Sequence, residues 1–319
     1  MASKKIVVLG TGGTIAGLAP HSGQGGPGHL AYRAGQVGVD RLLAVIPPLK
    51  GLPLLADQLA QVDSKDMGPV VWQALAARCA HWLSDDDVQG LVITHGTDTL
   101  EETAYFLHRV LAPHKPVVLT CAMRPADALA PDGPQNLVDA VAVAQSSGAQ
   151  GVVAVCAGQV HSAIDVAKVH PYRLDAFSSG DAGPIAWVEA GQLRLLRSWP
   201  VAADGRADLL AAAVARHSPT AWPSVEIVLN HAGADGRIVD ALVGAGVHGL
   251  VAAGTGNGTL SQMLEAALLR ARESGVEVVR STRCASGQVV PYRDDAIAVA
   301  RGLSPVKARI ALLLDLLVR

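Results

Sequence analysis

Short apolar runs, glycine-rich polar turns and longer stretches of helical spacing alternate along this chain, and their order limits the folds open to it. A run such as 90–93 is almost entirely branched and apolar, which is typical of a strand buried on both faces. A stretch such as 69–83 places apolar residues at helical spacing, which predicts an amphipathic helix. Repeated strand, turn and helix indicate a parallel sheet covered by helices on both faces. We therefore predict an α/β protein whose larger N-terminal domain has strands at 6–9, 54–62, 90–93, 117–120 and 151–155 and helices at 39–46, 69–83, 99–108 (capped by Thr99) and 136–146.

The rest of the chain predicts a smaller α/β domain. A hairpin of short strands is expected at 186–199, with Gly191 at its turn. The stretch 202–223 mixes Asp, Gly, Ala and Pro, which is typical of a linker. After it we expect strands at 225–229, 249–253 and 276–280 and helices at 238–243, 260–273 and 307–318. The predicted organisation is a catalytic α/β domain at 1–200, a linker at 201–223 and a C-terminal α/β domain at 224–319, since 319 residues suffice for two cores.

Composition excludes several classes of partner. The formal net charge is −2, without a basic stripe or an acidic tail, which argues against nucleic acid and against an anionic membrane surface. No run reaches the roughly 18 apolar residues of a membrane span, and the apolar run at 6–9 is too short for a signal peptide. The cysteines are scattered, without the paired spacing of a metal site. We expect a soluble, cytoplasmic protein without disulfides.

Three turns at predicted strand ends are the best candidates for chemistry: 10–16, 94–99 and 254–259. Ligands collect at the carboxyl ends of strands in open α/β sheets, and each turn offers backbone N–H groups and threonine hydroxyls. A phosphate loop is excluded because G-x-x-x-x-G-K-[ST] is absent, and the dinucleotide fingerprint fails because Ile15 stands at its third glycine. The absence of H-E-x-x-H, C-x-x-C and G-x-S-x-G argues against a zinc site and a serine elbow. No metal or cofactor is expected.

Threonine hydroxyls remain as candidate nucleophiles. Thr14 is favoured, whereas Thr11 is expected to shape the turn. A threonine needs a base, and a lysine kept neutral by burial can serve. Lys168, close to Asp165 in a polar turn after a strand, is the candidate base. Taken singly, each has an ordinary alternative, which is a turn hydroxyl bonded to its own backbone or a solvated surface lysine.

Two motifs together resemble the bacterial L-asparaginase family. They are TGGTIAG at 11–17 and ITHGTDTLEETA at 93–104. Both are long and independent, and they occur in the family's order, which makes the resemblance specific. It extends over nearly the whole chain through DSKDM at 63–67, AMRP at 122–125, DGP at 132–134 with NL at 136–137, and GNG at 256–258.

The resemblance implies hydrolysis of the side-chain amide of L-asparagine, with L-glutamine as a possible second substrate, through a threonyl acyl-enzyme without metal or cofactor. Thr14 would be the nucleophile. Tyr32 would assist it from the segment 17–38, whose Gly, Pro, His and Ser content predicts a mobile lid. Thr97, Asp98 and Lys168 would form a second set that activates a nucleophile or water.

Substrate binding is implied in the same way. Ser64 and Asp98 would bind the α-carboxylate and α-ammonium groups, with Lys65 next to them, and backbone N–H groups near Thr97 would stabilise the oxyanion. The turn with Asn257 would reach into a neighbouring subunit's site, which implies a homodimer or homotetramer with shared active sites.

The chain departs from the family pattern at two places. Lys65 stands where many members carry Gln, and its charge is expected to weaken amino-acid binding unless it turns outward or pairs with Asp66. A glutamate that supports the threonine–tyrosine pair in secreted members is also missing. No acid of the region 288–295 aligns cleanly with it, and Asp294 is the candidate replacement.

Simpler roles remain open for several of these residues. Tyr32 could only anchor its loop, and Ser64 could only cap a helix. Asn257 could serve a glycine turn that needs left-handed backbone angles. Cys121 and Cys284 lie beside motif residues, and we expect both to be buried bystander thiols.

Other functions stay open as alternatives. An amidotransferase subunit on the same catalytic domain generally has an additional N-terminal domain, whereas the first strand here is expected almost at residue 4. Another small-amide hydrolase would share the threonines. A nucleotide-binding oxidoreductase lacks its third glycine and its ribose-binding acid. A non-catalytic sensor on this fold would not need Thr14, Thr97, Asp98 and Lys168 together.

Overall fold

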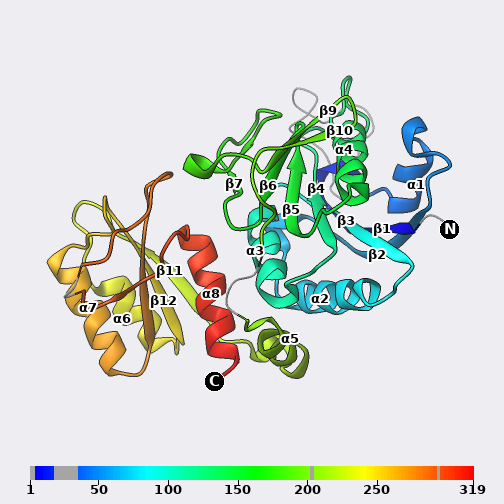
Figure 1. Cartoon of the computed structure of the whole chain (residues 1–319). Helices are drawn as coiled ribbons and strands as arrows, with labels where there is room; N and C mark the ends of the chain where they lie inside the picture. The colour runs from blue at the N-terminus through cyan, green and yellow to red at the C-terminus, as the bar shows by residue number, and fades with distance from the viewer. Residues whose placement is uncertain (1–3, 18–34, 202–204, 293–294) are drawn as a thin grey trace, which may run out of the picture. The chain divides into compact units, whose positions relative to one another are not determined.

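The computed structural model describes residues 4–17, 35–201, 205–292 and 295–319. The chain divides into two compact units, Met1–Ala207 and Asp208–Arg319, each with its own sheet (Figure 1). We call them the first and the second unit and describe each by itself. No helix among the described residues is both long and apolar enough to cross a membrane.

The described part of the first unit is built on an eight-stranded sheet in the order β10-β9-β6-β5-β4-β3-β1-β2. Five neighbouring strands are parallel: β2 (Leu54–Val62), β1 (Lys5–Gly12), β3 (Val88–Thr94), β4 (Pro116–Thr120) and β5 (Gly151–Cys156). Three antiparallel strands complete it: β6 (Gln159–Ser162), β9 (Ala186–Glu189) and β10 (Gln192–Leu195). The predicted parallel sheet and the hairpin at 186–199 are confirmed, whereas β6 was not predicted.

Helices cover both faces of this sheet. Ile6 and Val8 lie in one core cluster with residues of α1 (Val39–Ala44) and α4 (Gly133–Gln145). Asp57 of β2 faces the other way, where Arg78 and Trp82 of α2 (Pro69–Leu83) donate to its carboxylate, and α2 packs beside α3 (Leu100–Leu111). Covering on both faces explains why consecutive positions in the middle of β1, β3, β4 and β5 are apolar.

The order of the parallel strands determines where a ligand can bind. β2 lies on one side of β1, while β3, β4 and β5 continue on the other side. The direction of winding therefore reverses between β1 and β3, and a crevice forms at the carboxyl ends of strands at such a switch point. The turns 10–16 and 94–99 follow these two strands.

The second unit has a four-stranded parallel sheet in the order β11-β12-β13-β14. Its strands are β11 (Val225–Leu229), β12 (Gly249–Gly254), β13 (Glu277–Thr282) and β14 (Ala298–Val299). One face packs on α6 (Arg237–Gly244) and α7 (Gln262–Glu273), and the other packs on α8 (Pro305–Leu317). The predicted α/β fold of this part is confirmed.

One further helix, α5 (Ala207–Arg216), lies inside the stretch that we expected to be a linker. Its sequence is rich in alanine, the strongest helix former, and Leu210, Ala213 and Val214 are buried. The Asp, Gly and Pro residues around the helix concealed the helical spacing of its buried residues. The expected linker is therefore partly helical.

Candidate active site

The turns that follow β1, β2 and β3 meet at two glycines. Gly13 has a φ of 81°, and a Cβ on it would lie 2.4 Å from the Cα of Gly96. A Cβ on Gly96 would lie 2.4 Å from the Oγ of Ser64. The backbone of one turn thus contacts the backbone of the next, which only glycine permits. This contact brings residues from three strand ends into one place.

The two threonines of the first turn have different surroundings. The hydroxyl of Thr11 donates to the carbonyl of Thr94 at 2.8 Å, so its predicted role in shaping the turn is confirmed. Thr14 begins a short 3-10 turn, Thr14–Ala16, directly after the contact glycine, and it is buried. Tyr32, the predicted assistant of Thr14, lies outside the described residues.

Thr97, Asp98 and Lys168 form one hydrogen-bonded set. The Lys168 Nζ donates to Thr97 Oγ1 at 2.8 Å and to Asp98 Oδ1 at 2.5 Å. The Thr97 hydroxyl also lies 3.4 Å from Asp98 Oδ1. Thr97 is buried, and the side chain of Lys168 is 17% exposed, whereas that of Asp98 is 53% exposed. The set therefore combines a hydroxyl held by the amino group of Lys168 with a carboxylate that can still reach a ligand.

Lys168 comes from a small separate sheet. It lies in β7 (Ala167–Lys168), which pairs with β8 (Phe177–Ser178). Its backbone N–H donates to Glu101 Oε1 at 3.3 Å. Lys168 was predicted as a site residue, whereas Glu101 was part of the motif 93–104 without a role of its own, because nothing in the spacing connects residues this far apart.

Ser64 connects the turn after β2 to the turn 94–99 after β3. Its hydroxyl accepts the N–H of Asp98 at 3.1 Å, and its carbonyl accepts the hydroxyl of Thr99 at 2.6 Å. Thr99 does precede α3, but its side chain makes no capping bond, so the predicted side-chain cap is wrong. Ser64 is not a cap either, because Asp63 holds that position before the turn Ser64–Asp66.

Lys65 turns outward. Its Nζ lies 2.5 Å from Asp63 Oδ2 and 3.5 Å from Asp66 Oδ2, and its side chain is 62% exposed. The hydrogen bond to Asp63 is the main cause that raises the pKa of Lys65 above its ordinary value. The charge of Lys65 was expected to weaken binding unless the side chain turned outward or paired with Asp66. The structure shows both the outward orientation and the pairing.

His95 precedes the second contact glycine and is completely buried. Its Nδ1 lies 2.7 Å from the carbonyl of Gly96, while Nε2 has no hydrogen-bond partner among the described residues. Burial lowers the pKa of His95 to about 4, so the ring is neutral near pH 7. His95 lies inside the motif 93–104, but neither its spacing nor the family resemblance pointed to a role for it.

The motifs near 122–137 hold the neighbouring strand ends in place. The Asp132 carboxylate accepts the N–H groups of Met123 and Arg124, both at 2.9 Å. Asn136 donates to the carbonyl of Cys121 at 2.9 Å and accepts the N–H of Ala157 at 3.0 Å. These residues therefore fix the loops after β4 and β5.

All four cysteines lie in the described part of the chain and are free. Cys121 is buried as expected, and a hydrogen bond with Cys156 together with burial raises its pKa. Cys284 is exposed, so the prediction that it is buried is wrong.

The turn with Asn257 belongs to the second unit. The Asn257 side chain donates to the carbonyl of Val290 at 2.9 Å and accepts its N–H at 2.7 Å. The positive φ angles of this turn belong to Gly256 and Gly258, so the idea that Asn257 supplies left-handed backbone is wrong. As the structure stands, its amide joins two loops of the second unit.

The acids of the region 288–295, where a replacement for the missing glutamate was sought, are described only in part. Asp295 lies 2.7 Å from Arg280 and accepts the N–H of Tyr292 at 2.8 Å. Asp294 lies outside the described residues. Among the described residues, no group of three or more His, Cys, Asp or Glu side chains could hold a metal ion.

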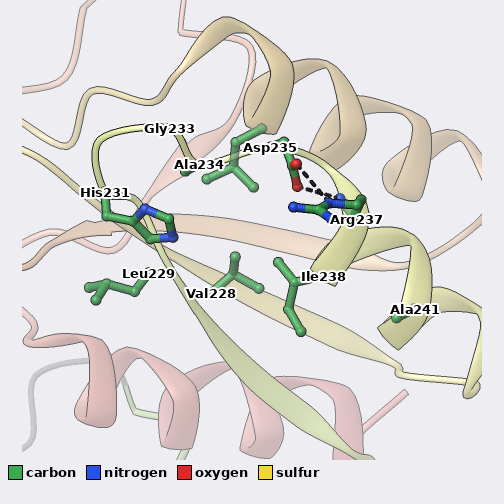
Figure 2. A pocket seen from close by; sticks show the side chains of 10 residues that line it. Val228, Leu229, His231, Gly233, Ala234, Asp235, Arg237, Ile238 and Ala241 are labelled. Atoms are coloured by element: carbon green, nitrogen blue, oxygen red, sulfur yellow. Dashed lines mark hydrogen bonds and ion pairs between the residues drawn. The ribbon is translucent and has the colours of Figure 1, made fainter.

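The second unit also contains a pocket of about 370 Å³, shown in Figure 2. Val228, Ile238 and Leu264 supply apolar lining, and Asp235 accepts the N–H and the Nε–H of Arg237 at its rim. The described lining includes none of the predicted site residues. The pocket thus lacks the threonine–lysine chemistry of the first unit.

Comparison with known proteins covers nearly the whole chain. The family described as Asparaginase, N-terminal, matches residues 5–201, and the Glutaminase/Asparaginase C-terminal domain matches residues 224–317. L-asparaginase 2 of Bacillus subtilis is 37% identical over 98% of this chain and 82% of its own length. Glutaminase-asparaginase of Pseudomonas fluorescens biotype A is 35% identical over 96% and 84%. The solved structure of a probable cytoplasmic L-asparaginase from Campylobacter jejuni has a TM-score of 0.89 and 34% identity, covering 98% of this chain and 95% of that one.

Proposed function

The chain belongs to the asparaginase family, and on that premise we propose that it hydrolyses the side-chain amide of L-asparagine to L-aspartate and ammonia. The observation that carries the proposal is the set of Thr97, Asp98 and Lys168 at the sheet's switch point. Thr14 directly follows Gly13, the glycine that contacts Gly96 in the turn of Thr97. A hydroxyl nucleophile and a lysine-bound hydroxyl thus belong to adjoining turns.

The reaction proceeds through an ester on Thr14. Its oxygen attacks the amide carbon, the C–N bond breaks, and the hydroxyl proton leaves with the nitrogen as ammonia. Water then attacks the ester, which releases aspartate and restores the Thr14 hydroxyl. Lys168 is the base in this proposal: through the Thr97 hydroxyl that it binds, it takes the proton of the attacking oxygen and returns it to the leaving group, while Asp98 holds the lysine in place. Backbone N–H groups near Thr97 stabilise the oxyanion, each worth roughly 3–4 kcal/mol.

Ser64 and Asp98 bind the amino-acid end of the substrate in this proposal. The hydroxyl of Ser64 accepts one bond from Asp98 N–H, which leaves its own hydrogen to donate to the α-carboxylate. The half-exposed carboxylate of Asp98 is the partner of the α-ammonium group. Lys65 lies beside them with its charge compensated by two acids. L-glutamine is the second substrate, as the names of some relatives suggest.

Ammonia release from L-asparagine tests the function. We expect Thr14→Ala and Thr97→Ala each to lower kcat by a factor of at least about 1,000, a loss typical of catalytic groups. The matched control is Thr220→Ala, which removes an exposed hydroxyl of the second unit and should leave kcat unchanged. Activity that survives both site substitutions would refute the threonine mechanism, and no ammonia release from the parent protein would refute the substrate.

Assembly and location belong to the same proposal. We infer a homotetramer, or at least a homodimer, in which Asn257 contributes to a neighbouring subunit's site, as the family resemblance implies. We also infer a cytoplasmic location, supported by the name of the solved Campylobacter relative. Cell fractionation with an antibody to the chain checks the location, and recovery from a periplasmic extract would contradict it.

A further inference from the structure

Glu101 lies one helical turn after the Thr97–Asp98 turn, in the first turn of α3. Its Oε1 accepts the backbone N–H of Lys168 at 3.3 Å. The two residues are 67 positions apart in the chain, so this bond joins two separate segments. This contact of Glu101 is with the backbone of the lysine and not with its amino group.

Lys168 is attached at two points to the same short segment. Its ammonium group holds Thr97 and Asp98, and its backbone N–H holds Glu101, so side chain and main chain both bind to residues 97–101. Backbone bonds hold the chain on either side, from Val166 N–H to Ser162 and from Val169 N–H to Ala176, but the N–H of Lys168 itself donates to Glu101. β7 has only two residues, and Lys168 pairs there with Phe177 of β8. Neither strand belongs to the main sheet among the described residues.

We propose that Glu101 is a positioning residue, which sets the backbone of Lys168 at the distance from which its ammonium group reaches Thr97. A lysine side chain has four flexible bonds, so an anchored backbone narrows the positions its Nζ can take. Because α3 and the turn before it are continuous, Glu101 moves together with Thr97 and Asp98 as one piece. The inference rests on the proposed function of the Thr97, Asp98 and Lys168 set.

The role differs from that of an acid at a helix N-terminus, which stabilises the helix by its charge alone. Glu101→Asp separates the two, because it keeps a carboxylate in the first turn of α3 but shortens its reach by one methylene. Glu101→Gln does the opposite, because it removes the charge and keeps an oxygen acceptor at the same place.

The experiment measures kcat and KM for L-asparagine, together with the melting temperature. We expect Glu101→Ala and Glu101→Asp to lower kcat roughly 10- to 100-fold, as misplacement of a catalytic group does, with KM nearly unchanged. Glu101→Gln should keep most of kcat. Melting temperatures should fall for Glu101→Ala but stay near the parent value for Glu101→Asp.

A double-substitution cycle with Lys168→Met links the effect to the lysine. Once Lys168→Met has removed the ammonium group, Glu101→Asp should cause no additional loss of kcat. Unchanged kcat in Glu101→Asp, or equal losses in Glu101→Gln and Glu101→Asp, would overturn the inference. If Lys168→Met keeps full activity, the proposed function of the lysine fails. If Lys168→Met is inactive but Glu101→Asp keeps full activity, only the positioning role of Glu101 fails.

Discussion

Single residues at the turn contacts decide whether this site can form. Gly13 and His95 show two different constraints, one steric and one electrostatic. Gly13 must lack a side chain because backbone atoms of the neighbouring turn occupy the space. His95 must stay neutral because it is sealed from water. Both constraints act within the turns that carry Thr14 and Thr97.

Gly13→Ala is expected to destabilise the protein and to lower its activity. The new methyl group would lie 2.4 Å from Gly96, and the φ of 81° is unfavourable for alanine, so about 3 kcal/mol or more of unfolding free energy should be lost. The control is Gly51→Ala, with a φ of 83° but open space around it, which should cost about 1 kcal/mol. Urea denaturation and kcat compare the two, and equal losses would contradict the steric account.

The lowered pKa of His95 predicts that the protein loses stability as the pH falls below 6.5. Its pKa is about 4 in the folded protein and 6.5 in the unfolded chain, so between these values the unfolded chain binds more protons. Its contribution to stability is therefore complete above pH 6.5 and falls by about 3 kcal/mol as the pH drops to 4. Urea midpoints over this range measure the slope. His95→Gln should flatten it, and an unchanged slope would show that other groups cause the acid loss.

At the scale of elements, the edge strand β2 is attached to α2 by a polar cluster. Asp57 accepts two contacts from Arg78, at 2.6 and 2.7 Å, and one from Trp82 at 2.7 Å. The Asp57 side chain is 13% exposed. A largely buried carboxylate is stable here because three contacts replace its hydration. β2 leads directly to Ser64, so the cluster also supports the turn that carries Ser64.

Asp57→Ala is expected to lower the unfolding free energy by about 2 kcal/mol, because it leaves the donors of Arg78 and Trp82 without their acceptor. Glu189→Ala, which breaks an exposed pair with Arg194, should cost less than about 1 kcal/mol. Thermal unfolding of both variants checks the contrast. Similar shifts in melting temperature would mean that burial of the Asp57 cluster contributes nothing.

At the scale of the whole molecule, each unit has its own sheet and core. Most residues of the proposed site belong to the first unit. Thr14, Thr97 and Lys168 belong to the first unit, while Asn257 belongs to the second. In the second unit Asn257 already binds the backbone of Val290. The family resemblance implies that Asn257 acts in catalysis through assembly of several chains, and this stays a prediction.

The assembly prediction is tested by mass in solution. Light scattering of the purified protein should give four times the mass of the chain, or twice that mass for the smaller assembly. A monomer with full activity would contradict shared active sites. Asn257→Ala should reduce activity in either assembly, and it should also loosen the loop at Val290.

The sequence by itself determined most of the elements and, through the family resemblance, which residues to expect at the site. Short branched apolar runs between polar turns predict buried strands, so most of the parallel sheet and its helices follow from local pattern, although β6 and α5 did not. The motifs 11–17 and 93–104 contain Thr14 and Thr97, and the family resemblance implies Lys168. Local pattern failed where neighbours far away in the chain decide the outcome. The hydroxyl of Thr99 bonds to Ser64 instead of its own helix, Asn257 bonds to Val290, and Cys284 is exposed. Only the tertiary structure could place Lys168 on Thr97 and Glu101 on Lys168, because these contacts join segments about 70 residues apart that meet only once the sheet has formed.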